Sequence, residues 1–156
     1  MPEKGIFQLR TANDLFRKLK HDLKRVTDDP SDSYAAFDFF VTALHISDWK
    51  GINNKSKKKL FAESLAPTDK AIWDVCCQLA NGSKHFEVFG CYAAVKKTKL
   101  SRPAFDGNAF ESEAFDVGHL TVRLEEEPAA QLGTTSVGVD ALAVKLVEFW
   151  QEHLTQ

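Results

Sequence analysis

Polar side chains able to exchange protons or bind a ligand recur along one face of an otherwise apolar segment, residues 33–49. They are Asp38, Thr42, His45 and Asp48, with Trp49 beside the last. Residues three and four positions apart share a face when the chain is helical. Because burying an unpaired carboxylate costs several kcal/mol, we expect each of these groups to have a partner.

A second polar stripe follows a later segment, residues 67–86. Its members are Asp74, Gln78, Asn81 and His85, with Lys84 alongside. The same helical spacing places them on one face. The simplest arrangement sets the two stripes against each other or against a shared cleft. Together they would offer imidazoles, carboxylates, amides, a hydroxyl and an ammonium.

Three interpretations of the two stripes remain open. The first is a buried hydrogen-bond network that fixes how two core helices pack. The second is a zinc, iron or manganese site formed by His45, Asp48 and His85, with Asp74 as a further candidate ligand. The third is a site that handles a nucleotide or RNA. Because no recognised ligand motif such as E-x-x-H is present, we expect neither a bound metal nor a cofactor.

Five segments have apolar residues at helical spacing, and we expect a helix in each. They are residues 11–26, 33–49, 52–66, 67–86 and 139–154. Thr11 and Asp14 resemble a capping box at the start of the first helix. The second helix should be buried on most sides and end near Gly51. In the third, the run Lys-Ser-Lys-Lys-Lys at 55–59 is either a phosphate-binding patch or a solvated face.

The pattern then changes to strict alternation, which predicts strands at residues 86–93 and 120–125. A long connection joins them, with room for a third short strand near 110–115. Residues 126–138 have no periodic pattern, and we expect a loop there.

The sequence therefore predicts a mainly α fold. We expect one helical-bundle domain over residues 1–156, with a small antiparallel β-hairpin at about 86–126 inserted before the C-terminal helix. Cys76 and Cys77 are adjacent, and Cys91 makes the number of cysteines odd, so we expect small buried hydrophobic residues rather than disulfides.

Overall charge and hydropathy exclude some classes of function. Lys and Arg total 20 against 22 Asp and Glu, a net charge of −2. This balance does not favour bulk binding to nucleic acid or an anionic membrane, although it allows a small local site. No apolar run approaches the roughly 18 residues that span a bilayer, and the first residues hold no apolar signal core. We therefore expect a cytoplasmic protein with no membrane contact.

The segment from Leu79 to His85 resembles the L-R-N-x-x-x-H signature of HEPN domains. HEPN domains are helical bundles, often dimeric, found in prokaryotic toxin and phage-defence systems, and many are metal-independent ribonucleases. The resemblance implies that Asn81 and His85 are catalytic or binding residues of a site shared across a homodimer. Ala80 stands where the motif has arginine. The pair of segments 43–49 and 81–85 also looks like small uncharacterised bacterial and phage proteins.

The expected function is that of a HEPN-like module which binds a nucleotide, RNA or a protein partner, without strong catalysis of its own. The binding residues would be those of the two stripes: His45, Asp48, Trp49, Asp74, Gln78 and Lys84. One alternative is a ribonuclease or metal-dependent hydrolase that uses His45, Asp48 and His85. Another is a purely structural or interaction protein.

Overall fold

The computed structural model describes residues 4–84, 94–101 and 118–155. Within these ranges the chain forms six helices and three strands. The helices are α1 (Ala12–Asp28), α2 (Ser33–Trp49), α3 (Lys55–Ser64), α4 (Pro67–Lys84), α5 (Glu126–Leu132) and α6 (Val139–Leu154). The strands are β1 (Val95–Ser101), β2 (His119–Leu124) and β3 (Ser136–Gly138).

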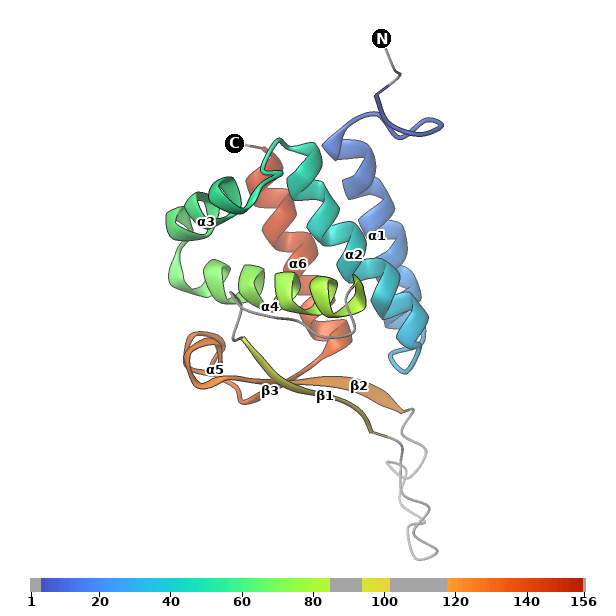
Figure 1. Cartoon of the computed structure of the whole chain (residues 1–156). Helices are drawn as coiled ribbons and strands as arrows, with labels where there is room; N and C mark the ends of the chain where they lie inside the picture. Colours follow the sequence, from blue (N-terminus) through green and yellow to red (C-terminus); the bar gives the residue numbers. More distant parts are fainter. Residues whose placement is uncertain (1–3, 85–93, 102–117, 156) are drawn as a thin grey trace, which may run out of the picture.

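The helices form one bundle, and the small sheet lies across one end of it (Figure 1). Helices α1, α2 and α6 pack side by side and α4 crosses beneath them, while both α4 and α6 contact the sheet. This arrangement confirms a mainly α fold with a small antiparallel sheet before the last helix. No helix among the described residues is both long and apolar enough to cross a membrane.

Local signals set the ends of the first two helices as the sequence predicts. The Thr11 hydroxyl accepts from the Asp14 backbone N–H at 3.2 Å, and the Asp14 carboxylate accepts from the Thr11 backbone N–H at 2.8 Å, which completes the capping box. Asp32 caps α2 by accepting from two backbone N–H groups of its first turn. Beyond the end of α2, Gly51 has a φ of +92°, a conformation that glycine adopts without steric cost.

A buried polar network joins α1 to α2. The Asp22 side chain is only 3% exposed and pairs with the Lys18 ammonium at 2.5 Å. The Thr42 hydroxyl donates to Asp22 at 3.2 Å and accepts from Lys18 at 2.9 Å. One of the expected stripe residues therefore serves the packing of α2 against α1, whereas the first interpretation places such a network between the two stripes.

The core is centred on aromatic side chains from three helices. We call Phe61 of α3, Trp73 of α4, and Phe149 and Trp150 of α6 the aromatic cluster. Trp73 meets Trp150 edge-on with ring centroids 5.9 Å apart, and Phe61 stacks on Trp150 at 6.2 Å. Edge-on and stacked pairs of this kind add to the free energy gained from burial. Cys76 and Cys77 are also fully buried, as expected.

The sheet differs from the expected hairpin in two respects. It has three strands in the order β1-β2-β3, all antiparallel, because residues 136–138 pair with β2. The segment 126–138, expected to be a loop, also contains α5, so that prediction is wrong. Two acidic residues in the first turn of α5 and Gly133 in the left-handed conformation at its end stabilise this short helix. The strands expected at 86–93 and near 110–115 lie outside the described residues.

Candidate functional site

A pocket of about 430 Å³ opens between α2, α3 and α4, and we call it the α2–α4 pocket. Its lining consists of Phe37, Val41, Leu44, His45, Asp48, Lys58, Ala80 and Asn81. His45 and Asp48 come from the first polar stripe, and Asn81 comes from the second. Three side chains from the two stripes therefore line one pocket at this point.

Lys58 places a cation in the α2–α4 pocket. Its ammonium lies 2.8 Å from the Asp48 carboxylate, and the two side chains are 19% and 34% exposed. Asp48 thus has the partner that its place on an apolar helix requires. Sequence reasoning did not single out Lys58 within its lysine run, because only the fold of α3 against α2 shows which lysine turns inward.

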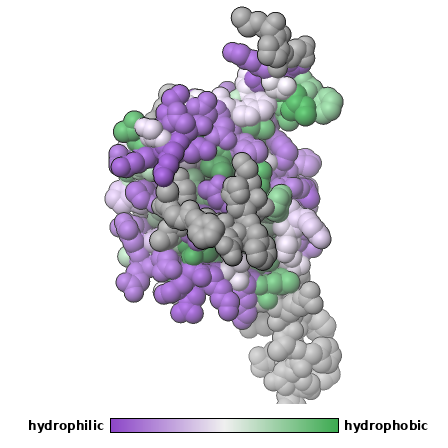
Figure 2. Space-filling model, in the orientation of Figure 1, coloured by the Kyte–Doolittle hydropathy of each residue, from purple (hydrophilic) through white to green (hydrophobic). Residues whose placement is uncertain are grey.

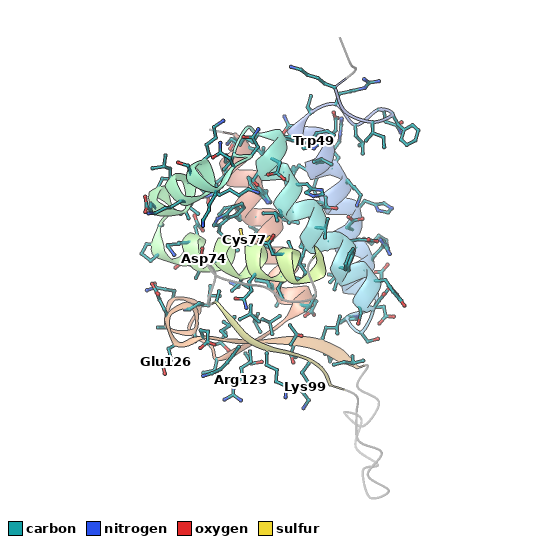
Figure 3. All side chains as sticks on the ribbon, viewed as in Figure 1. Trp49, Asp74, Cys77, Lys99, Arg123 and Glu126 are labelled. Carbon is teal, nitrogen blue, oxygen red and sulfur yellow. The ribbon has the colours of Figure 1, made fainter. Side chains whose placement is uncertain are left out.

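The other residues of the first stripe face elsewhere. Asp38 pairs with Arg25 of α1 at 2.8 Å, and Thr42 joins the buried network with Asp22. Trp49, 36% exposed, lies at the C-terminal end of α2 (Figure 3). It is not among the residues that line the pocket. Of the first stripe, only His45 and Asp48, near the C-terminal end of α2, therefore contribute to the site.

The second stripe divides in the same way. Asp74 pairs with Lys70 on its own helix at 2.5 Å. The Gln78 amide accepts from the backbone N–H groups of Ala94 and Val95 at 2.8 and 2.7 Å, and donates to the Val95 carbonyl at 2.9 Å. Gln78 thereby fixes the start of β1 against α4. The His85 residue and the Lys84 side chain lie outside what the structure describes.

The start of α3, the helix that brings Lys58 to the α2–α4 pocket, is rich in lysine. Lys55, Lys57, Lys58 and Lys59 all lie in the first five residues of α3, whose first turn holds no acidic residue. The positive end of the helix dipole disfavours cations at this position. Lys57 donates to the Gly51 carbonyl at 3.1 Å, and Lys59 lies 3.8 Å from Glu63. Figure 2 shows that the visible face over α3 is largely hydrophilic.

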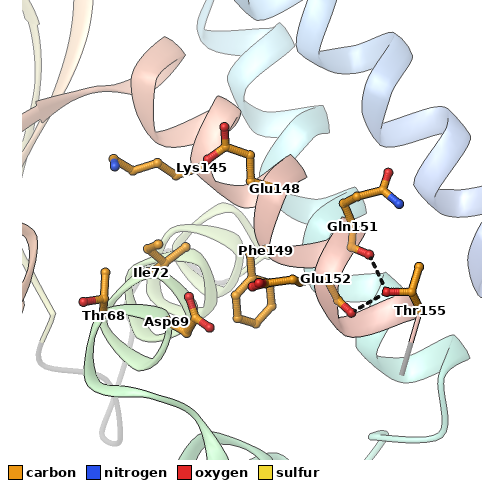
Figure 4. A pocket seen from close by; sticks show the side chains of 9 residues that line it. All are labelled: Thr68, Asp69, Ile72, Lys145, Glu148, Phe149, Gln151, Glu152 and Thr155. Atoms are coloured by element: carbon orange, nitrogen blue, oxygen red, sulfur yellow. Dashed lines mark hydrogen bonds between the residues drawn. The ribbon is translucent and has the colours of Figure 1, made fainter.

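A second group of ionisable side chains, which sequence reasoning missed, lies between α4 and α6. The His153 imidazole is 3.3 Å from the Asp69 carboxylate, across 84 residues of sequence. The adjoining pocket measures about 580 Å³, and we call it the α4–α6 pocket (Figure 4). Neither residue belongs to a stripe, so only the packing of α6 on the start of α4 brings them together.

The chain was compared with protein-family models, with curated proteins and with solved structures. None of the three comparisons finds a match.

Proposed function

We propose that this protein binds a phosphate-bearing ligand with an unpaired base, either single-stranded RNA or a free nucleotide, in the α2–α4 pocket. The observation that carries the proposal is the position of Lys58 and His45 in one pocket, with three further lysines in the first five residues of the same helix. The HEPN-like relationship, a homodimer and a role in a prokaryotic or phage conflict system remain predictions beside it.

The α3 lysines supply the affinity for phosphate. Their placement at the positive end of a helix is unfavourable for the protein alone, and a bound anion relieves it. Backbone N–H groups at a helix start and lysine ammonium groups both bind phosphate oxygens. Lys55 has no ion-pair partner among the described residues, so its ammonium is available to a ligand.

The pocket wall supplies a surface for the base. Phe37, 46% exposed, lies at its rim, while Leu44 and Ala80 form an apolar floor. Stacking on an aromatic ring is worth about 1–3 kcal/mol for each base and tolerates any sequence. The Asn81 amide and the Asp48 carboxylate are the groups that can meet a base edge or a ribose hydroxyl.

Binding without efficient cleavage is the outcome that this pocket favours. Phosphodiester cleavage builds negative charge on the phosphate, and a fixed cation that stabilises this charge is commonly the largest catalytic contribution. Ala80 offers no such group at its place on the pocket wall. The ribonuclease alternative, with His85 as general acid and base, is therefore the second candidate.

Fluorescence anisotropy with a labelled single-stranded RNA of about ten nucleotides tests the proposal. We expect Lys55→Gln with Lys58→Gln to weaken RNA binding at least about tenfold. The plot of log affinity against log salt concentration has a negative slope. This slope should become shallower by roughly 0.7 for each phosphate that the variant no longer neutralises. Competition by unlabelled mononucleotide distinguishes a nucleotide site from one that needs a longer strand.

A matched control comes from the outer face of the sheet. Lys97, Lys99 and Arg123 are exposed there, and Figure 3 shows Lys99 and Arg123 pointing away from the helices. Lys97→Gln with Lys99→Gln removes the same charge from a different surface and should leave binding within about twofold. Equal losses in both double variants would contradict a defined site. Metal-independent RNA cleavage that His85→Ala abolishes would favour the ribonuclease instead.

A further inference from the structure

Three potential metal ligands converge at the edge of the α4–α6 pocket. Asp69 lies in the first turn of α4, and Glu152 and His153 lie in the last turn of α6. One ligand atom from each of the three lies within 4.8 Å of the other two. Figure 4 shows Asp69 and Glu152 on the facing helices that border the pocket. It is the one such group of three among the residues that the structure describes.

The spacing of the two less exposed ligand atoms fits a tetrahedral metal ion. With metal–ligand distances of about 2.0–2.2 Å, two ligands of tetrahedral zinc lie roughly 3.3–3.6 Å apart. The His153 Nε2 and Asp69 Oδ2 atoms are 3.3 Å apart. The same two atoms lie within hydrogen-bond distance of each other, so His153 and Asp69 pair directly when no ion is bound.

Aromatic side chains hold the His153 ring in place before any ligand binds. The side chain is 14% exposed, and its ring centroid lies 4.4 Å from that of Phe149 and 5.8 Å from that of Phe61. An imidazole fixed in this way loses little rotational freedom when it binds a metal. Glu152 is exposed, so its carboxylate can rotate towards the other two ligands.

The charges around the pocket also favour a cation. Carboxylates of Asp69, Glu148 and Glu152 line it, while Lys145 is its single lysine. Glu152 and His153 lie at the C-terminal end of α6, which is the negative end of the helix dipole.

We propose that Asp69, Glu152 and His153 bind a divalent transition-metal ion, and that zinc suits this set of one imidazole nitrogen and two carboxylate oxygens best. Three protein ligands leave one tetrahedral position, which faces the α4–α6 pocket of about 580 Å³. Water or a small anionic ligand can occupy that position, with Lys145 and Thr68 on the pocket wall nearby.

Calorimetric titration of the chelator-treated full chain with Zn²⁺ tests the site. We expect one ion per chain with a Kd of roughly micromolar or tighter. Asp69→Asn and His153→Gln should each weaken binding at least about 100-fold, since each removes a direct ligand. Co²⁺ should give the visible absorption bands of a tetrahedral complex in the parent chain and not in these variants.

His21→Gln is the matched control, because His21 also lies near a carboxylate, 3.5 Å from Asp22, but without a third ligand. It should leave Zn²⁺ affinity unchanged. If circular dichroism shows that His153→Gln disturbs the fold, the Glu152→Gln variant tests the site instead, because Glu152 is exposed. We expect Glu152→Gln to weaken Zn²⁺ binding at least about tenfold. The proposal would be overturned if the parent chain bound no Zn²⁺. It would also be overturned if Asp69→Asn and Glu152→Gln bound Zn²⁺ as strongly as the parent chain does.

Discussion

Asp14 carries more hydrogen bonds than its place on the first turn of a surface helix requires. Its carboxylate accepts from the Arg10 backbone N–H at 2.9 Å and from the Thr11 N–H and hydroxyl, each at 2.8 Å, and it pairs with Arg17. These bonds, with that from the Arg10 backbone the largest influence, hold the pKa of Asp14 well below its ordinary value of 3.8. The ionised carboxylate therefore stabilises the folded state.

Asp14→Asn should lower stability at neutral pH and make less difference in acid. A depressed pKa contributes stability that is present above the unfolded pKa and is lost as pH falls towards the folded pKa. We expect urea midpoints of parent and variant to differ by a constant amount from about pH 7 to about pH 4, and to converge as the pH falls from about 4 to about 2. Asp28→Asn, which changes a carboxylate that is 62% exposed, is the control. A difference that stays constant below about pH 4 as well would show that the charge is not responsible.

Single residues show where sequence reasoning succeeds and where it stops. The capping box of Thr11 and Asp14 was predictable, because it depends on residues three positions apart. The need of Asp38 and Asp48 for partners was also predictable, since both lie on an apolar helix. Their partners, Arg25 and Lys58, were not, because each comes from another helix and the sequence holds many equivalent cations.

Among the elements, the Gln78 side chain of α4 makes three hydrogen bonds at the start of β1 within the described residues. Replacing Gln78 by Met would leave the backbone N–H groups of Ala94 and Val95 without their present acceptor. Because an unsatisfied buried polar group costs about 1–3 kcal/mol, we expect Gln78→Met to lower the free energy of unfolding by about 2–3 kcal/mol. Chemical denaturation measures this change.

The control for Gln78 is Gln131→Met on α5, where the side chain is exposed. That substitution should change stability by no more than about 0.5 kcal/mol. Equal stability of the two variants would show that water replaces the three Gln78 hydrogen bonds at no cost in stability.

Helices were easier to predict than strands because their periodicity is local. The expected helix over 139–154 agrees with α6, and the strand expected at 120–125 agrees closely with β2. The described strand β1, by contrast, reads Val-Lys-Lys-Thr-Lys-Leu-Ser, and its lysines obscure any alternation. Residues 136–138 become a strand only by pairing with β2, which no three-residue pattern can specify.

At the scale of the whole molecule, the thiols of Cys76 and Cys77 report on global unfolding. Both are fully buried, and burial raises the pKa of the Cys76 thiol to about 12. At pH 8 only on the order of one Cys76 in ten thousand would be a thiolate, the form that reacts with disulfide reagents. Labelling therefore requires that the core opens.

We expect the Cys91→Ser variant to show almost no thiol labelling under native conditions and two labelled thiols in denaturant. When the core closes again faster than the reagent reacts, the labelling rate should follow the equilibrium constant for unfolding as urea is added. Rapid native labelling that does not respond to low urea would indicate a local opening around α4 instead.

The central position of α6 has a consequence for the protein while it is being made. Leu142, Leu146 and Trp150 are completely buried against helices that precede α6 in the chain. The ribosome completes the apolar α2 about 90 residues before it reaches α6, a delay of roughly 5–20 s at ordinary rates of synthesis. During that interval the apolar faces of the earlier helices have no final partner. We therefore expect the nascent chain to bind chaperones that shield apolar surfaces at the ribosome exit.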